Sequence, residues 1–192
     1  MRRLAVEVGK IASDLRLLSM GPRAGLSEIA LPAVQPGSSI MPGKVNPSVP
    51  EMVNQVCFQV MGCDVTIAIA CEAGQLELNV MMPVIAWNAL HASKILREAL
   101  KVFRWRCVDG ITADEVRARE LLDRSSALAT ALSPYIGYAA TAEIAKTAMK
   151  TGRTIRDLVL ERGLVDKDRL DRILSPDAMT RGGVVGKEEK ER

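Results

Sequence analysis

The sequence has few aromatic residues, a small charge imbalance and no long uninterrupted apolar run. Aromatic side chains make up 3% of the 192 residues although hydrophobic ones make up 48%, so aliphatic side chains must fill the core. The formal net charge of +3 comes from interspersed basic and acidic residues, which create no concentrated field for a polyanion. This composition is typical of packed helices, and we predict an all-α fold with no nucleic-acid partner.

Cysteine and histidine are too sparse to build a zinc site or a disulfide framework. The four cysteines lie in apolar stretches without a Cys-x-x-Cys pair, and His91 is the one histidine that could join them. We therefore expect reduced, buried thiols, no metal and no cofactor. We interpret His91 as a packed or surface residue, and Trp87, Met81 and Met82 as core residues.

No segment has the roughly 20 uniformly apolar residues that spanning a bilayer takes. Asn54, Gln55 and Asp64 interrupt the strongest candidate. The first residues also lack the apolar region of a secretory signal. We therefore expect a cytoplasmic protein that does not associate with a membrane.

The first half of the chain predicts long helices. From 2 to 19, apolar residues recur at spacings of three and four, which is typical of an amphipathic helix. This periodicity starts without a cap, so we expect the chain to begin inside a longer element. A loop containing Pro and Gly follows through Pro36, and a helix from about 76 to 107 should be kinked by Pro83.

The most apolar helix is expected to begin at Ser48. Ser48 and Glu51 match a capping box, in which a hydroxyl and a carboxylate satisfy backbone N–H groups at the start of a helix. Apolar residues then follow a 3.5-residue period, and Asp64 is the one charged residue between Met52 and Cys71. A helix with almost no solvated face belongs inside a bundle, and we expect this one to lie between subunits.

After residue 109 the elements become short and charged, beginning with a second capping box at Thr112 and Glu115. We predict helices at about 113–123, 125–132, 138–151, 154–162 and 167–174. The last residues lack periodicity, which predicts disorder. The expected division is a segment of a long-helix bundle over 1–108, a small helical C-terminal domain over 109–180 and a disordered tail over 181–192.

The segment from Gly37 to Pro47, Gly-Ser-Ser-Ile-Met-Pro-Gly-Lys-Val-Asn-Pro, carries the candidate chemistry and is called the signature loop below. Its two glycines and two prolines exclude a helix or a central strand. Two hydroxyls, one ammonium and one carboxamide lie here without a charge-balancing partner nearby in sequence. This combination favours anion binding.

The signature loop matches the motif of the fumarase/aspartase superfamily at every fixed position, and the resemblance extends from Ser19 nearly to Met179. The stretches from Pro50 to Val56 and from Glu72 to Met81 resemble its aspartate ammonia-lyase branch. The resemblance implies a catalytic base at Ser38 and substrate contacts at Ser39, Lys44 and Asn46.

Three further residues have supporting roles by this resemblance. Glu51 aligns with an acid that, in fumarases, supports a histidine of another subunit, or it serves only as the helix cap. Gly37 and Gly43 hinge a lid over the substrate, or they only permit the turn.

The resemblance implies the elimination of ammonia from L-aspartate to give fumarate through an enolate, in a homotetramer whose active sites are shared between subunits. Of the three regions that build such a site, one is present, so we interpret the chain as the C-terminal portion of such an enzyme and expect it to be inactive alone. Two alternatives stay open. One is a fumarate hydratase on the same scaffold, and the other is a non-enzymatic truncated chain that retains the oligomerising helices.

Overall fold

The computed structural model describes residues 1–21, 23–35, 37, 41, 43–181 and 183. The predicted all-α class is confirmed, because apart from one pair of two-residue strands the regular elements of this described chain are helices. The chain divides into two compact units, Met1–Glu115 (unit 1) and Val116–Arg192 (unit 2). The predicted tail lies outside the described residues except for Arg181 and Gly183.

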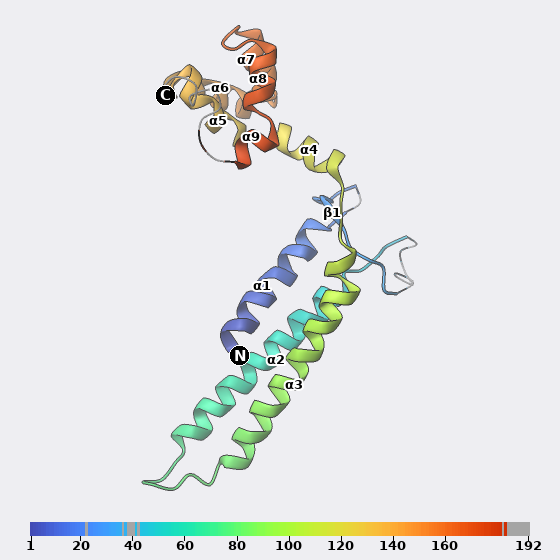
Figure 1. Ribbon diagram of the computed structural model, residues 1–192, viewed down its shortest axis with the longest axis vertical. Coiled ribbons are helices and arrows are strands. Elements are labelled where there is room, and N and C mark those ends of the chain that lie inside the picture. Colours follow the sequence, from blue (N-terminus) through green and yellow to red (C-terminus); the bar gives the residue numbers. More distant parts are fainter. Residues whose placement is uncertain (22, 36, 38–40, 42, 182, 184–192) are drawn as a thin grey trace. The chain divides into compact units, whose positions relative to one another are not determined.

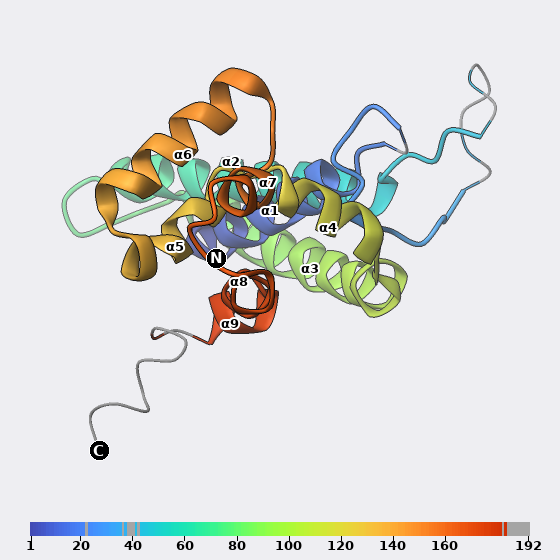
Figure 2. The ribbon, with the colours of Figure 1, turned by 90° about the horizontal axis from the view of Figure 1, so that it is seen from above.

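Unit 1 is built on three long helices, α1 (Arg2–Leu18), α2 (Ser48–Glu72) and α3 (Met82–Arg106), followed by the 3-10 turn η1 (Val108–Gly110). Figures 1 and 2 show α2 lying against both α1 and α3. Small and branched aliphatic side chains fill the contacts, which lets the helices approach closely. The buried core of unit 1 includes Ala5, Val8, Ala12, Val53, Cys57, Val60, Cys63, Ala92, Leu96, Phe103 and Cys107.

The third helix begins later than the sequence predicts. It starts at Met82 with Pro83 in its first turn, where a missing N–H costs nothing, so the prediction that Pro83 kinks the helix was wrong. The residues before it form a tight turn in which the backbones of Gln75 and Leu78 exchange two hydrogen bonds of 2.8 and 3.1 Å. Asn79 closes the end of α2 by donating to the carbonyl oxygens of Ala70 and Cys71.

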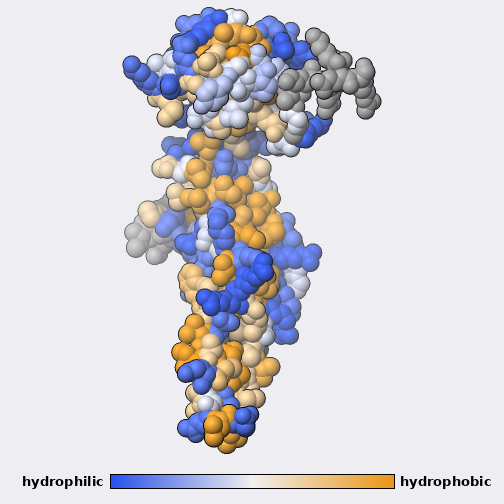
Figure 3. All heavy atoms as spheres, turned by 90° about the vertical axis from the view of Figure 1, so that its left-hand side faces the viewer, coloured by the Kyte–Doolittle hydropathy of each residue, from blue (hydrophilic) through white to orange (hydrophobic). Residues whose placement is uncertain are grey.

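The assignment of Trp87 and the two methionines to the core was also wrong. Trp87 is 69% exposed and stacks on His91, with ring centroids 5.8 Å apart, and Met81 and Met82 are exposed as well. Apolar side chains also stand exposed on α2, including Phe58 and Ile69. The surface of unit 1 in Figure 3 accordingly carries apolar residues between charged ones.

Three of the four thiols behave as predicted. Cys57, Cys63 and Cys107 are buried, whereas Cys71 is exposed near the end of α2, and all four are free. Burial raises the pKa of the Cys57 and Cys107 thiols because desolvation disfavours the thiolate.

Two short strands, β1 (Ile29–Ala30) and β2 (Thr112–Ala113), pair antiparallel with Ile29 opposite Ala113. The sequence predicts a loop at β1 and a helix cap at Thr112, and both expectations were wrong. The pairing is extended by the amide of Asp114, which donates to the carbonyl oxygen of Glu28 at 2.8 Å. It ties the connection after α1 to the chain that leaves α3.

Unit 2 contains short helices packed around a second core. They are α4 (Glu115–Asp123, which begins one residue before the boundary), α5 (Leu128–Ile136), α6 (Tyr138–Thr151), α7 (Ile155–Glu161), α8 (Lys167–Ile173) and α9 (Pro176–Thr180). The predicted helix at 125–132 ended too early, because α5 continues to Ile136 with Pro134 in its last turn. Leu132, Ile144, Ile155, Val159 and Leu170 form the centre of this core.

The helix α2 is long and apolar enough to cross a membrane by length and composition alone. By that criterion, Asn54 and Asp64 do not exclude α2 as a membrane-spanning helix, contrary to the expectation from the sequence. In unit 1, α2 uses Val53, Cys57 and Val60 to pack against neighbouring helices. The apolar side chains of α2 thus form its contacts with α1 and α3.

Candidate functional site

The described residues of the signature loop form a turn that closes at its base. Gly37 has a φ of 96° and Gly43 a φ of 80°, a conformation that favours glycine. A Cβ placed on Gly37 would lie 2.5 Å from the carbonyl oxygen of Lys44, so the two ends of this turn are in close contact. The amide of Lys44 also donates to the carbonyl oxygen of Met41 at 3.2 Å. Ser38 and Ser39 lie outside the described residues.

The end of the loop leads directly into the amino end of α2. Lys44 is exposed, and its ammonium forms no ion pair with a described residue. Asn46 is half-buried. Its backbone carbonyl oxygen accepts a 2.9 Å hydrogen bond from the backbone amide of Ser48, the first residue of α2. The free N–H groups and the positive dipole end of a helix stabilise anions. Lys44 and Asn46 lie just before such a helix end, so the cation and the carboxamide adjoin a region that already favours negative charge.

The predicted capping box at this helix start was wrong. The N-cap is Pro47, and no side chain caps the helix. Ser48 is already inside the first turn, so its hydroxyl cannot reach the amides that a cap serves and donates instead to the Asn46 carbonyl oxygen at 3.4 Å. The carboxylate of Glu51 is therefore not engaged in a cap. Its Oε1 lies 3.8 Å from Nη2 of Arg16 on α1.

Two residues near this helix start were not predicted as part of a site. Arg16 contacts Glu51 and also donates from Nη1 to Oδ1 of Asn54 at 3.2 Å. Asn54 is 4% exposed. A buried carboxamide in an otherwise apolar helix was the available signal, since such a group must find hydrogen-bond partners.

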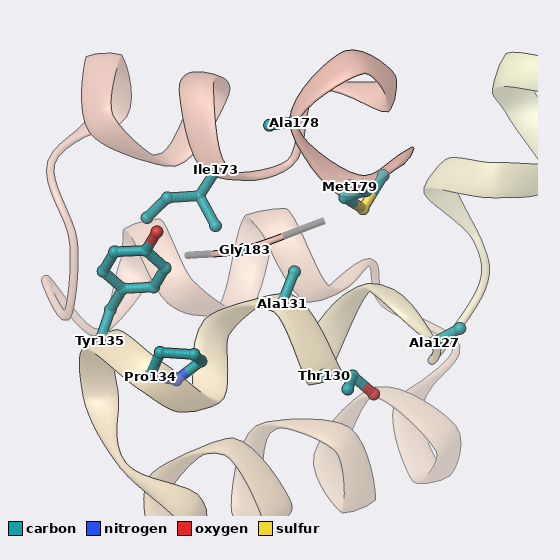
Figure 4. Close-up of a pocket in the computed structure, with 9 residues that line it drawn as sticks. All are labelled: Ala127, Thr130, Ala131, Pro134, Tyr135, Ile173, Ala178, Met179 and Gly183. Atoms are coloured by element: carbon teal, nitrogen blue, oxygen red, sulfur yellow. The ribbon is translucent and has the colours of Figure 1, made fainter. Parts of the chain in front are cut away.

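A cavity of about 330 Å³ lies in unit 2 between α5, the end of α8 and α9. Figure 4 shows Tyr135 and Ile173 on one side and Met179 on another. Its remaining lining residues are Ala127, Thr130, Ala131, Pro134, Ala178 and Gly183. No side chain among these carries a formal charge, so the cavity offers little to a dicarboxylate. The signature loop of unit 1 remains the candidate site.

No group of three His, Cys, Asp or Glu side chains within the described part of the chain is arranged to hold a metal ion. His91 is half-buried on α3, where it stacks on Trp87. His91 therefore packs on Trp87 at the surface of α3.

Family comparisons agree with the architecture of both units. The family described as Lyase matches residues 1–62, and the family described as Fumarase C C-terminus matches residues 128–181. A fumarate lyase:delta crystallin structure from Brucella melitensis superimposes with a TM-score of 0.86 at 53% identity, covering 93% of this chain and 38% of that one. The chain belongs to the fumarase/aspartase superfamily.

Within the superfamily, the similarity extends to aspartate ammonia-lyases. The enzyme of Pseudomonas canavaninivorans is 53% identical over 179 residues, and that of Bacillus subtilis is 50% identical over 183 residues. These matches cover 93% and 95% of this chain. The chain spans 38% of the length of each relative and matches the C-terminal part of that relative. A class II fumarase from Schistosoma mansoni has 40% identity and a TM-score of 0.85, with 93% of this chain and 37% of that one covered.

Proposed function

We propose that this chain is part of an aspartate ammonia-lyase, a carbon–nitrogen lyase that eliminates ammonia from L-aspartate to give fumarate. The observation that carries the proposal is the close approach of Gly37 to Lys44 in the signature loop, which places the exposed Lys44 just before the amino end of α2. A dicarboxylate that becomes more negatively charged during reaction fits this arrangement of a cation and a helix dipole.

In the proposed mechanism, Ser38 is the base. Its alkoxide removes the Cβ proton of L-aspartate, and the electron pair of that C–H bond forms an enolate on the adjacent carboxylate. The enolate then collapses to form the Cα–Cβ double bond of fumarate as the C–N bond breaks and ammonia leaves with its electron pair. A serine becomes a competent base only where preorganised donors stabilise the alkoxide. Lys44 binds a substrate carboxylate by charge and Asn46 by hydrogen bonding, while Ser39 contacts the substrate.

The supporting residues have separate roles. Gly37 and Gly43 permit the positive-φ turn and provide the hinges for closure over the substrate. We assign Glu51 a supporting role through its carboxylate, which does not cap α2 and lies 3.8 Å from Nη2 of Arg16. In the assembled enzyme it supports a group from another subunit.

The choice between an ammonia-lyase and a fumarate hydratase rests on sequence similarity. The identity is 53% to the Pseudomonas canavaninivorans aspartate ammonia-lyase and 40% to the Schistosoma mansoni fumarase over similar shares of the chain. Both folds superimpose equally well, so the scaffold does not discriminate between the two reactions. We therefore favour the ammonia-lyase and keep the hydratase as the second candidate.

Fumarate formation tests this choice. The longest gene product that contains this sequence should form fumarate from L-aspartate and not from L-malate, as measured by ultraviolet absorbance. The 192-residue chain alone should form none from either substrate, because it supplies one of the three regions of the site. Fumarate from L-malate alone would assign the chain to the hydratases, and inactivity of the longer product with both substrates would favour the non-enzymatic alternative.

We also propose that the chain acts within a cytoplasmic homotetramer. The exposed apolar side chains Phe58 and Ile69 on α2 and Trp87 and Leu90 on α3 support a further helix–helix contact. A second copy of the chain offers the same apolar surfaces and therefore a matching partner.

A charged substitution in this surface should weaken the assembly. In sedimentation velocity of the longest gene product, Phe58→Glu should shift the tetramer toward smaller species, because a desolvated carboxylate opposes the apolar contact. Val116→Glu, a substitution at an exposed residue of unit 2, serves as the control and should leave the tetramer intact. A tetramer that is equally stable in both variants would contradict this interface.

A further inference from the structure

Asn54 links the two helices that meet beside the signature loop. It is one of two buried polar or charged residues in the described chain, and the other is Thr141 in unit 2. Its Nδ2 donates to the carbonyl oxygen of Gly9 at 2.8 Å and to Oγ of Ser13 at 3.2 Å, both on α1. A buried carboxamide with these partners fixes the register between α1 and α2.

These two hydrogen bonds determine which way the carboxamide points. An amide NH₂ donates and a carbonyl oxygen can only accept, so the nitrogen must face Gly9 and the oxygen must face away. The oxygen then accepts from Nη1 of Arg16 at 3.2 Å. Asn54 thereby anchors one arm of the guanidinium.

The other arm of the guanidinium faces Glu51. Nη2 of Arg16 lies 3.8 Å from Oε1 of Glu51, which stands three residues before Asn54 on the same face of α2. Since the guanidinium is planar and its nitrogens are fixed relative to one another, holding one arm also orients the other. Gly9 also packs against α2 at this level, since a Cβ added there would be in ordinary van der Waals contact with Cβ of Cys57 at 3.5 Å.

We propose that Arg16 is a positioning residue for the reaction: anchored by Asn54, it holds the Glu51 carboxylate and the first turn of α2 in their working orientation. The inference rests on the proposed function of the signature loop, which joins this same turn at Asn46 and Ser48. Arg16 acts through Glu51 and not on the substrate itself.

The test compares three variants of the longest gene product that contains this sequence. Arg16→Gln removes the charge, Arg16→Lys keeps the charge without the planar fork, and Lys10→Gln removes another cation of α1, one that pairs with Asp14 on its own helix. For Arg16→Gln we expect kcat for fumarate formation to fall about tenfold with KM changed by less than about twofold, since small displacements of catalytic groups lower the rate steeply. Arg16→Lys should recover part of kcat, and Lys10→Gln should change neither constant.

Amide hydrogen exchange gives a second readout that does not need turnover. In Arg16→Gln the amides of residues 51 to 54 should exchange at least about threefold faster, while those of the rest of α1 and α2 keep their rates. Unchanged exchange at 51 to 54, or an equal acceleration throughout both helices, would overturn the positioning role. So would loss of kcat in Lys10→Gln equal to that in Arg16→Gln. Failure of the unmodified enzyme to form fumarate would instead overturn the proposed function, and exchange would still show whether Arg16 holds the first turn of α2.

Discussion

Alanine in place of Ser38 is expected to lower kcat for fumarate formation from L-aspartate by about 10³-fold, within the range for loss of a general base. KM should change by less than about threefold, because Lys44 and Asn46 still bind the substrate carboxylates. An interaction used mainly in the transition state lowers kcat and kcat/KM together when it is removed. Steady-state kinetics of the purified variant, followed by fumarate absorbance, measures both constants.

Ser93→Ala is the matched control for this substitution. Ser93 is exposed on α3, and its hydroxyl donates to the carbonyl oxygen of Ala89 in the same helix at 2.8 Å. Its removal should leave kcat within about twofold, since exposed substitutions of this kind have small effects. A Ser38→Ala enzyme with more than a tenth of the original kcat would show that another group removes the Cβ proton.

Leu132→Ala is expected to destabilise unit 2 by about 3 kcal/mol, within the range for deleting a buried leucine side chain. Leu132 is 0% exposed in α5 and belongs to the core that also contains Ile144 and Leu170. The loss combines the transfer free energy of the deleted atoms with the cavity that they leave. Amide exchange of peptides from α5 to α8 in increasing urea measures the free energy of unfolding of this unit separately from unit 1.

Leu160→Ala provides the comparison within the same unit. Leu160 lies on α7 and is 37% exposed, so the same deletion creates less of a cavity there. We expect a loss of about 1 kcal/mol or less. Equal losses for the two variants would contradict the assignment of Leu132 to the centre of the core.

Helices with strong local end signals could be predicted from the sequence. The predicted helix 138–151 has the same bounds in the structure, because Gly137 and Gly152 flank it with φ values of 79° and 71°. The start of α2 at Ser48 was also predicted correctly, but its cause was not. Pro47 is the N-cap, so Ser48 lies inside the first turn, and the capping-box spacing of Ser48 and Glu51 does not reveal this.

Contacts between segments far apart in the chain could not be predicted, because they leave no local pattern in the sequence. The ion pair of Arg16 with Glu51 and the strand pair of Ile29 with Ala113 both depend on how α1 to α3 pack. The large apolar side chain of Trp87 likewise led to its interpretation as a core residue, but the sequence does not tell what covers it. Within the signature loop, the substrate contacts of Lys44 and Asn46 stay a prediction from the motif, whereas the close approach of Gly37 to Lys44 is seen only in the structure.

The pairing of β1 with β2 has a consequence for the order of folding. It joins Ile29 to Ala113 and so closes a loop that contains the whole of α2 and α3. In a flexible chain, closing a loop of that length costs about 4 kcal/mol of entropy beyond the closure constant, whereas each backbone hydrogen bond returns about 1 kcal/mol. The strands therefore cannot act as a nucleus and must pair after the helices have brought them together. The segment that leads into the signature loop thus acquires its anchor late in folding, and a slow step in bundle assembly would delay the active conformation of the loop as well.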